Sequence, residues 1–338
     1  MKEILIILDG LMEERLENKD LKKMILGDFS KYATLSMTNY VTEGKPVDSL
    51  NCIFKMLGYS PSEYEIGDRA YYEALSMGIK LKKDETILRC NIALAKDNKL
   101  LDFTGGNLGN NLNEKLRGIN IKDGKFINCD NYKNLLILTD KDCTILNSKC
   151  YAPHFNVSKD IRDILPNNEK LKSIIDTSKL YFNENNLRNR ILWPWGPCKS
   201  VDLESFNSKH NKSATLISGI NLVHGMGIAL GMHSIKPNTC NGYYDTSLSE
   251  KLNVALIRVL EDDVVIIHVN GLDELSHKKC YVDKLNYMEK IRKELIIPII
   301  NSLKGKINCN IKITCDHRTD SYTGMHDENS VPEIIIEI

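Results

Sequence analysis

The sequence has no excess of charge of either sign, few aromatic residues and no long apolar run. Lysine plus arginine equals aspartate plus glutamate at 45 each, and aromatic residues make up 7% of the 338 residues. A balanced chain has no field that would attract nucleic acid or an anionic membrane. No apolar stretch approaches the ~20 residues that cross a bilayer. We therefore expect neither a nucleic-acid nor a membrane partner.

Paired cysteines are also lacking. The ten cysteines are scattered singly, and no Cys-x-x-Cys pair occurs. Neither a zinc knuckle nor a disulfide framework is therefore expected. The chain enters an apolar, strand-like run at once, without the features of a secretory leader. Free thiols without a leader favour a reducing, cytoplasmic environment.

Short apolar runs rich in β-branched residues recur towards both ends of the chain and predict buried strands. These runs cover residues 4–8, 214–218, 264–269, 311–315 and 333–338. Helical patterns, such as that of 284–303, lie between them. The alternation predicts an α/β fold with a doubly wound sheet.

The middle of the chain is rich in asparagine and lysine and has shorter strand-like runs. This change in composition predicts a smaller α+β cap domain over residues 84–212, inserted into a discontinuous catalytic domain over 1–83 and 213–338. Clefts between domains are favoured ligand sites, so the active site is expected there.

Acids and imidazoles follow three of the predicted strands. They are Asp9, Asp273, His277, Asp316, His317 and His326. Open α/β sheets bind ligands at the carboxyl ends of their strands. Carboxylates with neutral imidazoles suit zinc, manganese or related divalent ions, and three of each suffice for two ions. The alternatives are an aspartate that caps a helix and a histidine that belongs to the core. The joint pattern favours metal ligands, and we interpret His268, inside a strand, as structural.

Ser49 is the candidate nucleophile of such a site. It lies in the segment 44–61, GKPVDSLNCIFKMLGYSP. A divalent ion stabilises a serine alkoxide at neutral pH and neutralises phosphoryl oxygens. The alternative is that Ser49 is the N-cap of a helix that ends at Gly58.

The segment around Ser49 resembles the serine loop of archaeal-type cofactor-independent phosphoglycerate mutases, which are members of the alkaline phosphatase superfamily. That loop runs Ser-Asp-Thr-Ala-His-Leu-x-x-x-Gly-Tyr-x-Pro. The positions that match are Ser49, Gly58, Tyr59 and Pro61, and those that depart are Leu50, Asn51 and Ile53. The resemblance continues through 67–75, 89–91, 195–196 and 242–246, and then through Lys251 and the acid and histidine motifs. It covers both ends of the chain well and the middle poorly.

The resemblance implies a role for each matching residue. One divalent ion would be surrounded by Asp9, Ser49, Asp316 and His317. A second would be held by Asp273, His277 and His326. Lys251 would lie beside the transferring phosphoryl group, and the substrate would be bound by Arg69, Arg89 and Asn91. The ions would be Mn²⁺ or Zn²⁺, with Mg²⁺ and Co²⁺ as alternatives. A phosphoryl group would pass to Ser49 and then back to another hydroxyl of the same substrate.

The chain departs from this family mainly in the predicted cap domain. The family's Asp-Arg-Arg-Ala-Gly-Arg segment aligns with 102–107, DFTGGN, so three arginines are absent. Its His-Arg pair aligns with Lys133 and Asn134, and the lysine before its Asp-Glu-x-x-His motif is Asn270. Arginine suits bidentate recognition of phosphate and carboxylate. These losses therefore concern the substrate rather than the metal chemistry.

Three functions follow from these observations. The leading one is the glycolytic interconversion of 3- and 2-phosphoglycerate through a phosphoserine, independent of 2,3-bisphosphoglycerate. The second is a phosphatase or phosphotransferase that acts on another small phosphate or phosphonate. The third is a non-catalytic binding protein on the same fold, which the presence of Ser49 and every ligand position disfavours.

Overall fold

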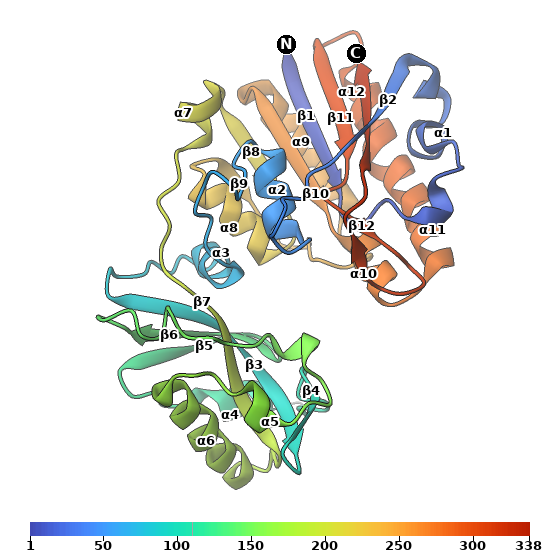
Figure 1. The fold of residues 1–338 in the computed structure, drawn as a ribbon. Coiled ribbons are helices and arrows are strands. Elements are labelled where there is room, and N and C mark those ends of the chain that lie inside the picture. Colours follow the sequence, from blue (N-terminus) through green and yellow to red (C-terminus); the bar gives the residue numbers. More distant parts are fainter. Residues whose placement is uncertain (110) are drawn as a thin grey trace. The chain divides into compact units, whose positions relative to one another are not determined.

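The computed structural model describes residues 1–109 and 111–338, which form two compact units (Figure 1). Unit 1 comprises Met1–Ile66 and Asp202–Ile338, and unit 2 comprises Gly67–Val201. Unit 2 thus begins and ends earlier than the expected 84 and 212. Residues 67–83 fall in unit 2 because their helix packs on strands of that unit. Residues 202–212 fall in unit 1, where the Phe206 amide donates to the Leu230 carbonyl.

Unit 1 is built on a seven-stranded sheet with the order β2-β14-β11-β1-β10-β8-β9. Its strands are β1 (Lys2–Leu8), β2 (Ala33–Thr38), β8 (Ala214–Ile217), β9 (His233–Ile235), β10 (Val264–Val269), β11 (Cys309–Thr314) and β14 (Val331–Glu337). The central strand β1 is parallel to both of its neighbours, β10 and β11, whereas β14 is antiparallel to β11, and the edge strand β2 is antiparallel to β14. The expected doubly wound sheet is therefore present, with the two antiparallel strands β14 and β2 on one side.

Helices of unit 1 bury alternate residues of this sheet. They are α1 (Leu21–Leu26), α2 (Ser49–Met56), α7 (Phe206–His210), α8 (Asn221–Ala229), α9 (Leu248–Glu261), α10 (Gly271–His277), α11 (Tyr281–Ile291) and α12 (Ile297–Leu303). Ile4, Ile6 and Leu8 of β1 join the main core with residues of α1, α9, α11 and α12. Side chains alternate between the faces of a strand, so this regular spacing gives the sheet one continuous apolar face.

The helix predicted over 284–303 is divided into two. A π turn at Arg292–Ile296 separates α11 from α12, and Pro298 lies in the first turn of α12. Proline has no N–H to give to the preceding turn, and a local change to π geometry is one way to accommodate it.

Unit 2 is an α+β unit, as expected for the cap. Its strands are β3 (Glu85–Lys96), β4 (Lys99–Asp102), β5 (Gly124–Asp130), β6 (Lys133–Thr139) and β7 (Arg190–Cys198). Its helices are α3 (Arg69–Ser76), α4 (Leu112–Arg117), α5 (Ile161–Ile164) and α6 (Glu169–Glu184). The pairings of β3 with β4, β6 and β7 are all antiparallel. Asp97 and Asn98 both have positive φ, which suits the two-residue turn between β3 and β4.

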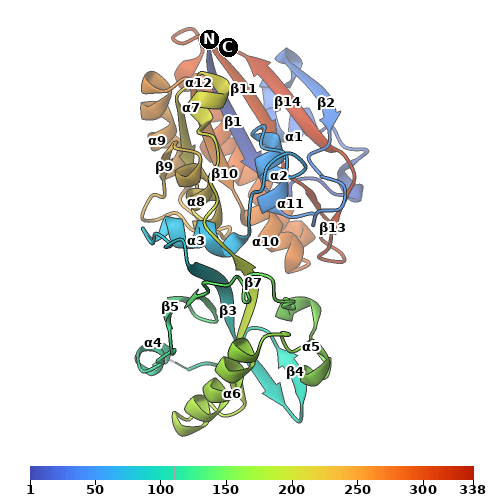
Figure 2. The ribbon, with the colours of Figure 1, turned by 60° about the vertical axis from the view of Figure 1, so that its left-hand side comes forward.

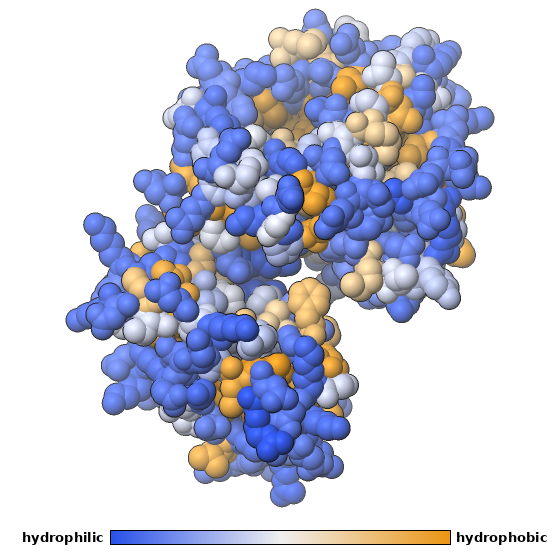
Figure 3. All heavy atoms as spheres, viewed as in Figure 1, coloured by the Kyte–Doolittle hydropathy of each residue, from blue (hydrophilic) through white to orange (hydrophobic). Residues whose placement is uncertain are grey.

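The surface of each unit is largely hydrophilic in the view of Figure 3, with scattered apolar residues. Within the part of the chain that the structure describes, no helix combines the length and apolar character needed to cross a membrane.

Candidate active site

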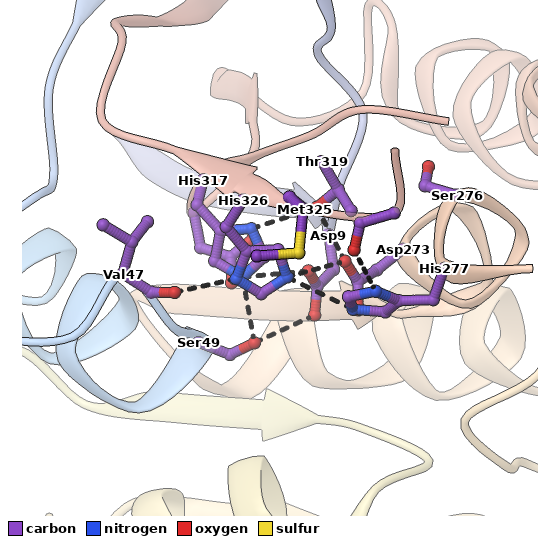
Figure 4. A network of polar contacts seen from close by, with 12 residues as sticks. Asp9, Val47, Ser49, Asp273, Ser276, His277, His317, Thr319, Met325 and His326 are labelled. Carbon is purple, nitrogen blue, oxygen red and sulfur yellow. Dashed lines mark hydrogen bonds and ion pairs between the residues drawn. The ribbon is translucent and has the colours of Figure 1, made fainter. Parts of the chain in front are cut away.

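Three adjacent strands of unit 1, β11, β1 and β10 (Figure 2), bring the predicted acids together at their carboxyl ends, and Figure 4 shows two of these acids, Asp9 and Asp273. Asp9 follows β1, Asp316 follows β11, and Asp273 lies in α10, which begins directly after β10. The approach of Asp273 to the end of β1 depends on Gly10, whose φ is +69°. A Cβ at residue 10 would lie 2.6 Å from the Asp273 Cα atom. Glycine is therefore required by both the backbone conformation and the space.

Several oxygens of the buried carboxylates lack a hydrogen-bond donor. Asp9 Oδ1 and both carboxylate oxygens of Asp316 are buried and accept no hydrogen bond from the residues that the structure describes. Burial raises the pKa of the Asp9 carboxyl well above its usual range, and the charges of Asp316 and Asp273 raise it further. Buried carboxylates without a partner are costly. The donor set therefore fits a bound cation.

His277 and His326 point their Nε2 atoms at a common position. These two atoms are 3.2 Å apart, and each lies close to Asp273, at 3.2 and 3.4 Å respectively. His277 Nδ1 lies 2.9 Å from the Gly324 carbonyl oxygen, and His326 Nδ1 lies 2.7 Å from that of Val47. A carbonyl only accepts, so each Nδ1 carries a proton, and each Nε2 would offer its lone pair to a bound cation. Such backbone contacts are the usual way in which a protein orients histidine ligands.

The charges around His277 and His326 agree with this arrangement. The bond to Asp273 raises the pKa of His277 to about 8. Burial alone would lower the pKa of His326, but its contacts with Asp273 and the Val47 carbonyl outweigh burial and raise it. Asp273 shows the reverse effect, because its bonds to the two histidines overcome burial and hold its pKa well below the usual range. Without a bound cation, protons therefore bind to these rings at neutral pH, and a cation must compete with those protons.

His317 lies between the two sets of ligands. One set of atoms within 4.8 Å of one another comes from Asp9, Asp316 and His317, and the other from Asp273, His317 and His326. His317 Nε2 lies 3.3 Å from Asp316 Oδ2, and its ring stacks on that of His326 with 3.9 Å between centroids. The family resemblance places His317 with the first ion alone, whereas the geometry brings it within reach of both sets.

Ser49 is the first residue of α2 and faces this cluster (Figure 4). Its Oγ lies 3.3 Å from Asp9 Oδ2, to which it donates, and 3.4 Å from His317 Nε2. The N-cap of α2 is Asp48, whose side chain accepts from the Asn51 amide at 2.9 Å. The alternative of Ser49 as the N-cap is therefore wrong, and its hydroxyl has no capping role to perform.

His268, interpreted as structural from the sequence, contacts the site directly. It is buried in β10, where its Nε2 lies 3.2 Å from Asp9 Oδ2 and its Nδ1 lies 3.2 Å from Ser218 Oγ. Burial lowers its pKa to about 4, so the ring is neutral and can donate one hydrogen bond to Asp9. A histidine in an otherwise apolar buried strand must find polar partners, and this requirement was the available signal in the sequence.

Lys251 is buried in α9, and its Nζ donates to the His268 carbonyl at 2.9 Å. Burial lowers its pKa to about 8, although a contact with Cys240 opposes the shift. The charged amine of Lys251 thus lies against β10, the strand that leads to Asp273. Its expected position beside a phosphoryl group stays a prediction.

Replacing Lys251 with methionine is expected to stabilise the protein at pH 7 by about 3 kcal/mol, at 1.36 kcal/mol per pKa unit. The unfolded lysine titrates near 10.5 and the folded one near 8, so the cost of its charge is fully present below pH 8. Between these values the unfolded state binds more protons, and wild-type stability rises with pH relative to the variant. Urea unfolding at pH 7 and at pH 10.5 measures the difference. An equal gap at both pH values would contradict the prediction, and the exposed Lys306→Met is the matched control.

The three residues expected to bind substrate lie in unit 2. Arg89 Nε is 3.2 Å from Glu73 Oε2, and the Arg89 guanidinium carbon lies 5.0 Å from the centroid of the Trp195 ring. Arg69 Nε is 3.9 Å from Glu73 Oε1. Asn91 Oδ1 accepts from the Trp195 indole at 2.9 Å, and its Nδ2 donates to the Phe103 carbonyl. Their role in binding substrate stays a prediction.

The fold of unit 1 and its cluster of polar side chains together define a class of protein. An α/β sheet that collects carboxylates, imidazoles and a serine at its carboxyl edge is suited to group transfer on small polar substrates.

Comparison with known proteins shows which enzymes this chain is similar to. Residues 31–185 match the family model described as 2,3-bisphosphoglycerate-independent phosphoglycerate mutase. The mutase of that name from Methanosarcina barkeri is 25% identical and covers 98% of this chain and 89% of its own length. A probable one from Geobacter sulfurreducens is 26% identical, over 99% of this chain and 90% of its own length. The chain is thus a relative of these mutases and an enzyme of the isomerase and phosphotransferase class.

Two solved structures share the fold. A Pyrococcus horikoshii protein superposes with a TM-score of 0.72 at 18% identity, over 99% of this chain and 87% of its own. Cofactor-independent phosphoglycerate mutase from Thermoplasma acidophilum superposes with a TM-score of 0.58 at 16% identity, over 99% of this chain and 89% of its own. The expected fold class is therefore confirmed.

Proposed function

We propose that this enzyme transfers a phosphoryl group through Ser49 with the help of two divalent ions, and that it interconverts 3- and 2-phosphoglycerate. The observation that carries the proposal is the position of the Ser49 hydroxyl. It lies beside Asp9 and His317, and three buried oxygens of Asp9 and Asp316 accept no hydrogen bond from the residues that the structure describes. The names of its relatives support the choice of substrate.

The residues that would hold the ions are Asp9, Ser49, Asp273, His277, Asp316, His317 and His326. A mixture of carboxylate oxygen and imidazole nitrogen suits Mn²⁺ or Zn²⁺, with Mg²⁺ and Co²⁺ as alternatives. When bound, such ions neutralise phosphoryl oxygens and lower the pKa of a coordinated hydroxyl.

The chain's own residues account for the positioning and for the proton. In the first transfer, Ser49 Oγ forms a bond to phosphorus as the bond to the substrate oxygen breaks, and the proton that the serine gives up passes to the freed glycerate oxygen. In the second transfer, the other hydroxyl of the same glycerate attacks phosphorus as the bond to Ser49 Oγ breaks, and its proton passes back to Ser49. Asp9 receives the hydrogen bond of the resting serine. Ser49 also opens α2, so the positive end of the helix dipole faces the transferred group.

A second candidate function is favoured by unit 2. Residue 103, where the family's arginine segment aligns, is a phenylalanine whose ring lies 5.9 Å from that of Tyr132 and 6.1 Å from that of His154. Arg69 and Arg89 remain nearby, and both lie close to Glu73. An aromatic cluster in place of guanidinium groups suits a less polar ligand than glycerate. The second candidate is therefore a phosphatase or phosphotransferase for another small phosphate or phosphonate.

A substrate panel tests both functions. Each lost arginine contact to a charged group costs roughly 1.5–3 kcal/mol, and about 1.4 kcal/mol is tenfold in rate. We therefore expect kcat/KM for 3-phosphoglycerate below about 10⁴ M⁻¹s⁻¹, with another phosphate ester performing better. The assay uses the purified protein with added Mn²⁺, and Ser49→Ala gives the background.

Each result of the panel decides between the functions. If phosphoglycerate is the best substrate and exceeds that value, the second candidate fails and the mutase function stands. If no ester is turned over under any Mn²⁺, Zn²⁺, Co²⁺ or Mg²⁺ condition, both functions are wrong and a binding role remains.

A further inference from the structure

Thr319 lies between the two sets of candidate ligands and touches both. It belongs to the two-stranded ladder of β12 (Arg318–Thr319) and β13 (His326–Asp327), in which it pairs with His326. Its Oγ1 lies 2.7 Å from Asp273 Oδ1 and 3.3 Å from His317 Nδ1. The side chain is fully buried, so water does not compete for these contacts.

The chemistry of the three partners fixes the direction of both hydrogen bonds. The Thr319 hydroxyl has one proton, and it donates that proton to Asp273 Oδ1 at 2.7 Å. The remaining capacity of Oγ1 is to accept, and it can do so only from a protonated Nδ1 of His317. The other ring nitrogen, Nε2, faces Ser49 and Asp316.

The backbone of Thr319 is held in place on both sides. Its amide donates to the Met12 carbonyl at 3.1 Å, and its carbonyl accepts from Lys284 Nζ at 3.1 Å. Lys284 is buried and paired with Glu13 at 2.7 Å, and Glu13 also accepts from the amide and hydroxyl of Ser321. This network anchors the ladder that carries His317 and His326.

We propose that Thr319 is a positioning residue that couples the two ligand sets: its hydroxyl selects the His317 tautomer that presents Nε2, and at the same time orients Asp273. The inference rests on the proposed metal site but concerns a residue outside the ligand set. Loss of the hydroxyl frees the His317 ring to adopt the other tautomer and leaves Asp273 with one partner fewer. Both ion positions should therefore weaken together.

The first measurement is calorimetric titration of the metal-free protein with Mn²⁺. Thr319→Val keeps the shape of the side chain but removes the hydroxyl, and should weaken both ion affinities by about 10–100-fold, as is usual for the partners of ligands. Thr319→Ser keeps the hydroxyl and should stay within about threefold of wild type. Unchanged affinities in Thr319→Val, or equal losses in both variants, would overturn the proposal.

The second measurement needs no metal. Ring-nitrogen NMR of ¹⁵N-histidine-labelled protein reports the tautomer of each neutral imidazole, and His317→Gln assigns the signal of His317. Wild type and Thr319→Ser should show the Nδ1–H form, and Thr319→Val should show a substantial Nε2–H population. A purely structural role would lower stability and leave the tautomer unchanged, which would refute the inference. If wild type binds no ion, the proposed function fails, and the tautomer still decides the role of Thr319.

Discussion

Ser49→Ala is expected to lower kcat for phosphoryl transfer by roughly 10⁴–10⁶-fold, as is usual when a covalent nucleophile is removed. Incubation of wild type with a good substrate should give a phosphoserine at residue 49, which peptide mass spectrometry can detect. The variant should fold normally, because Asp48 rather than Ser49 caps α2 and alanine is favourable in a helix. Steady-state assays and circular dichroism measure the two effects.

The matched control for this experiment is Ser36→Ala, an exposed serine on the edge strand β2 of the same unit. It should leave turnover and stability unchanged. Turnover in Ser49→Ala equal to that of the control would exclude a covalent route through this serine, whatever the substrate.

Asp316→Asn should be more stable than wild type without metal and less stable than wild type with metal. In the presence of a chelator the variant should be more stable, by about 1–3 kcal/mol, because it removes a buried charge whose oxygens have no hydrogen-bond donor. With Mn²⁺ at about 100 times its Kd, wild type should gain about 2.7 kcal/mol per bound ion. The variant should lose that gain for the ion near Ser49 and should also lose activity.

Chemical unfolding with and without Mn²⁺, together with metal analysis by mass spectrometry, measures this reversal. Asp142→Asn, at an exposed carboxylate, should behave as wild type in both conditions. If wild type gains no stability from any of the four divalent ions, the two-ion site does not exist, and the unpaired carboxylates need another explanation.

The sequence predicts part of this site well, for a simple geometric reason. Parallel strands end at one edge of a sheet, so acids that follow β1, β10 and β11 are brought together without knowledge of any contact. The apolar runs define those strands because most of their residues are buried. The order of the strands and the antiparallel pairing of β14 and β2 cannot be predicted in this way, because they depend on which strands pair.

The roles of His268 and Thr319 could not be predicted in the same way. Each acts through one hydrogen bond to a residue distant in the sequence, His268 to Asp9 and Thr319 to Asp273. No periodic pattern in the sequence predicts such a hydrogen bond, because a single hydroxyl or imidazole can bond to many different partners. The boundaries of the units were missed for a related reason, since α3 has no composition that distinguishes one unit from the other.

The position of β1 in the sheet constrains the order in which the chain can assemble. Its ladder partners are made late, because Glu3 pairs with Val264 and Lys2 pairs with Cys309. During synthesis on the ribosome the first strand therefore remains without either neighbour until most of the chain has emerged. All the ladders within unit 2 close earlier, between residues 85 and 198. The serine and the first carboxylate are thus among the first groups of the site to be synthesised, but they cannot be brought to its other residues until the final strands are complete.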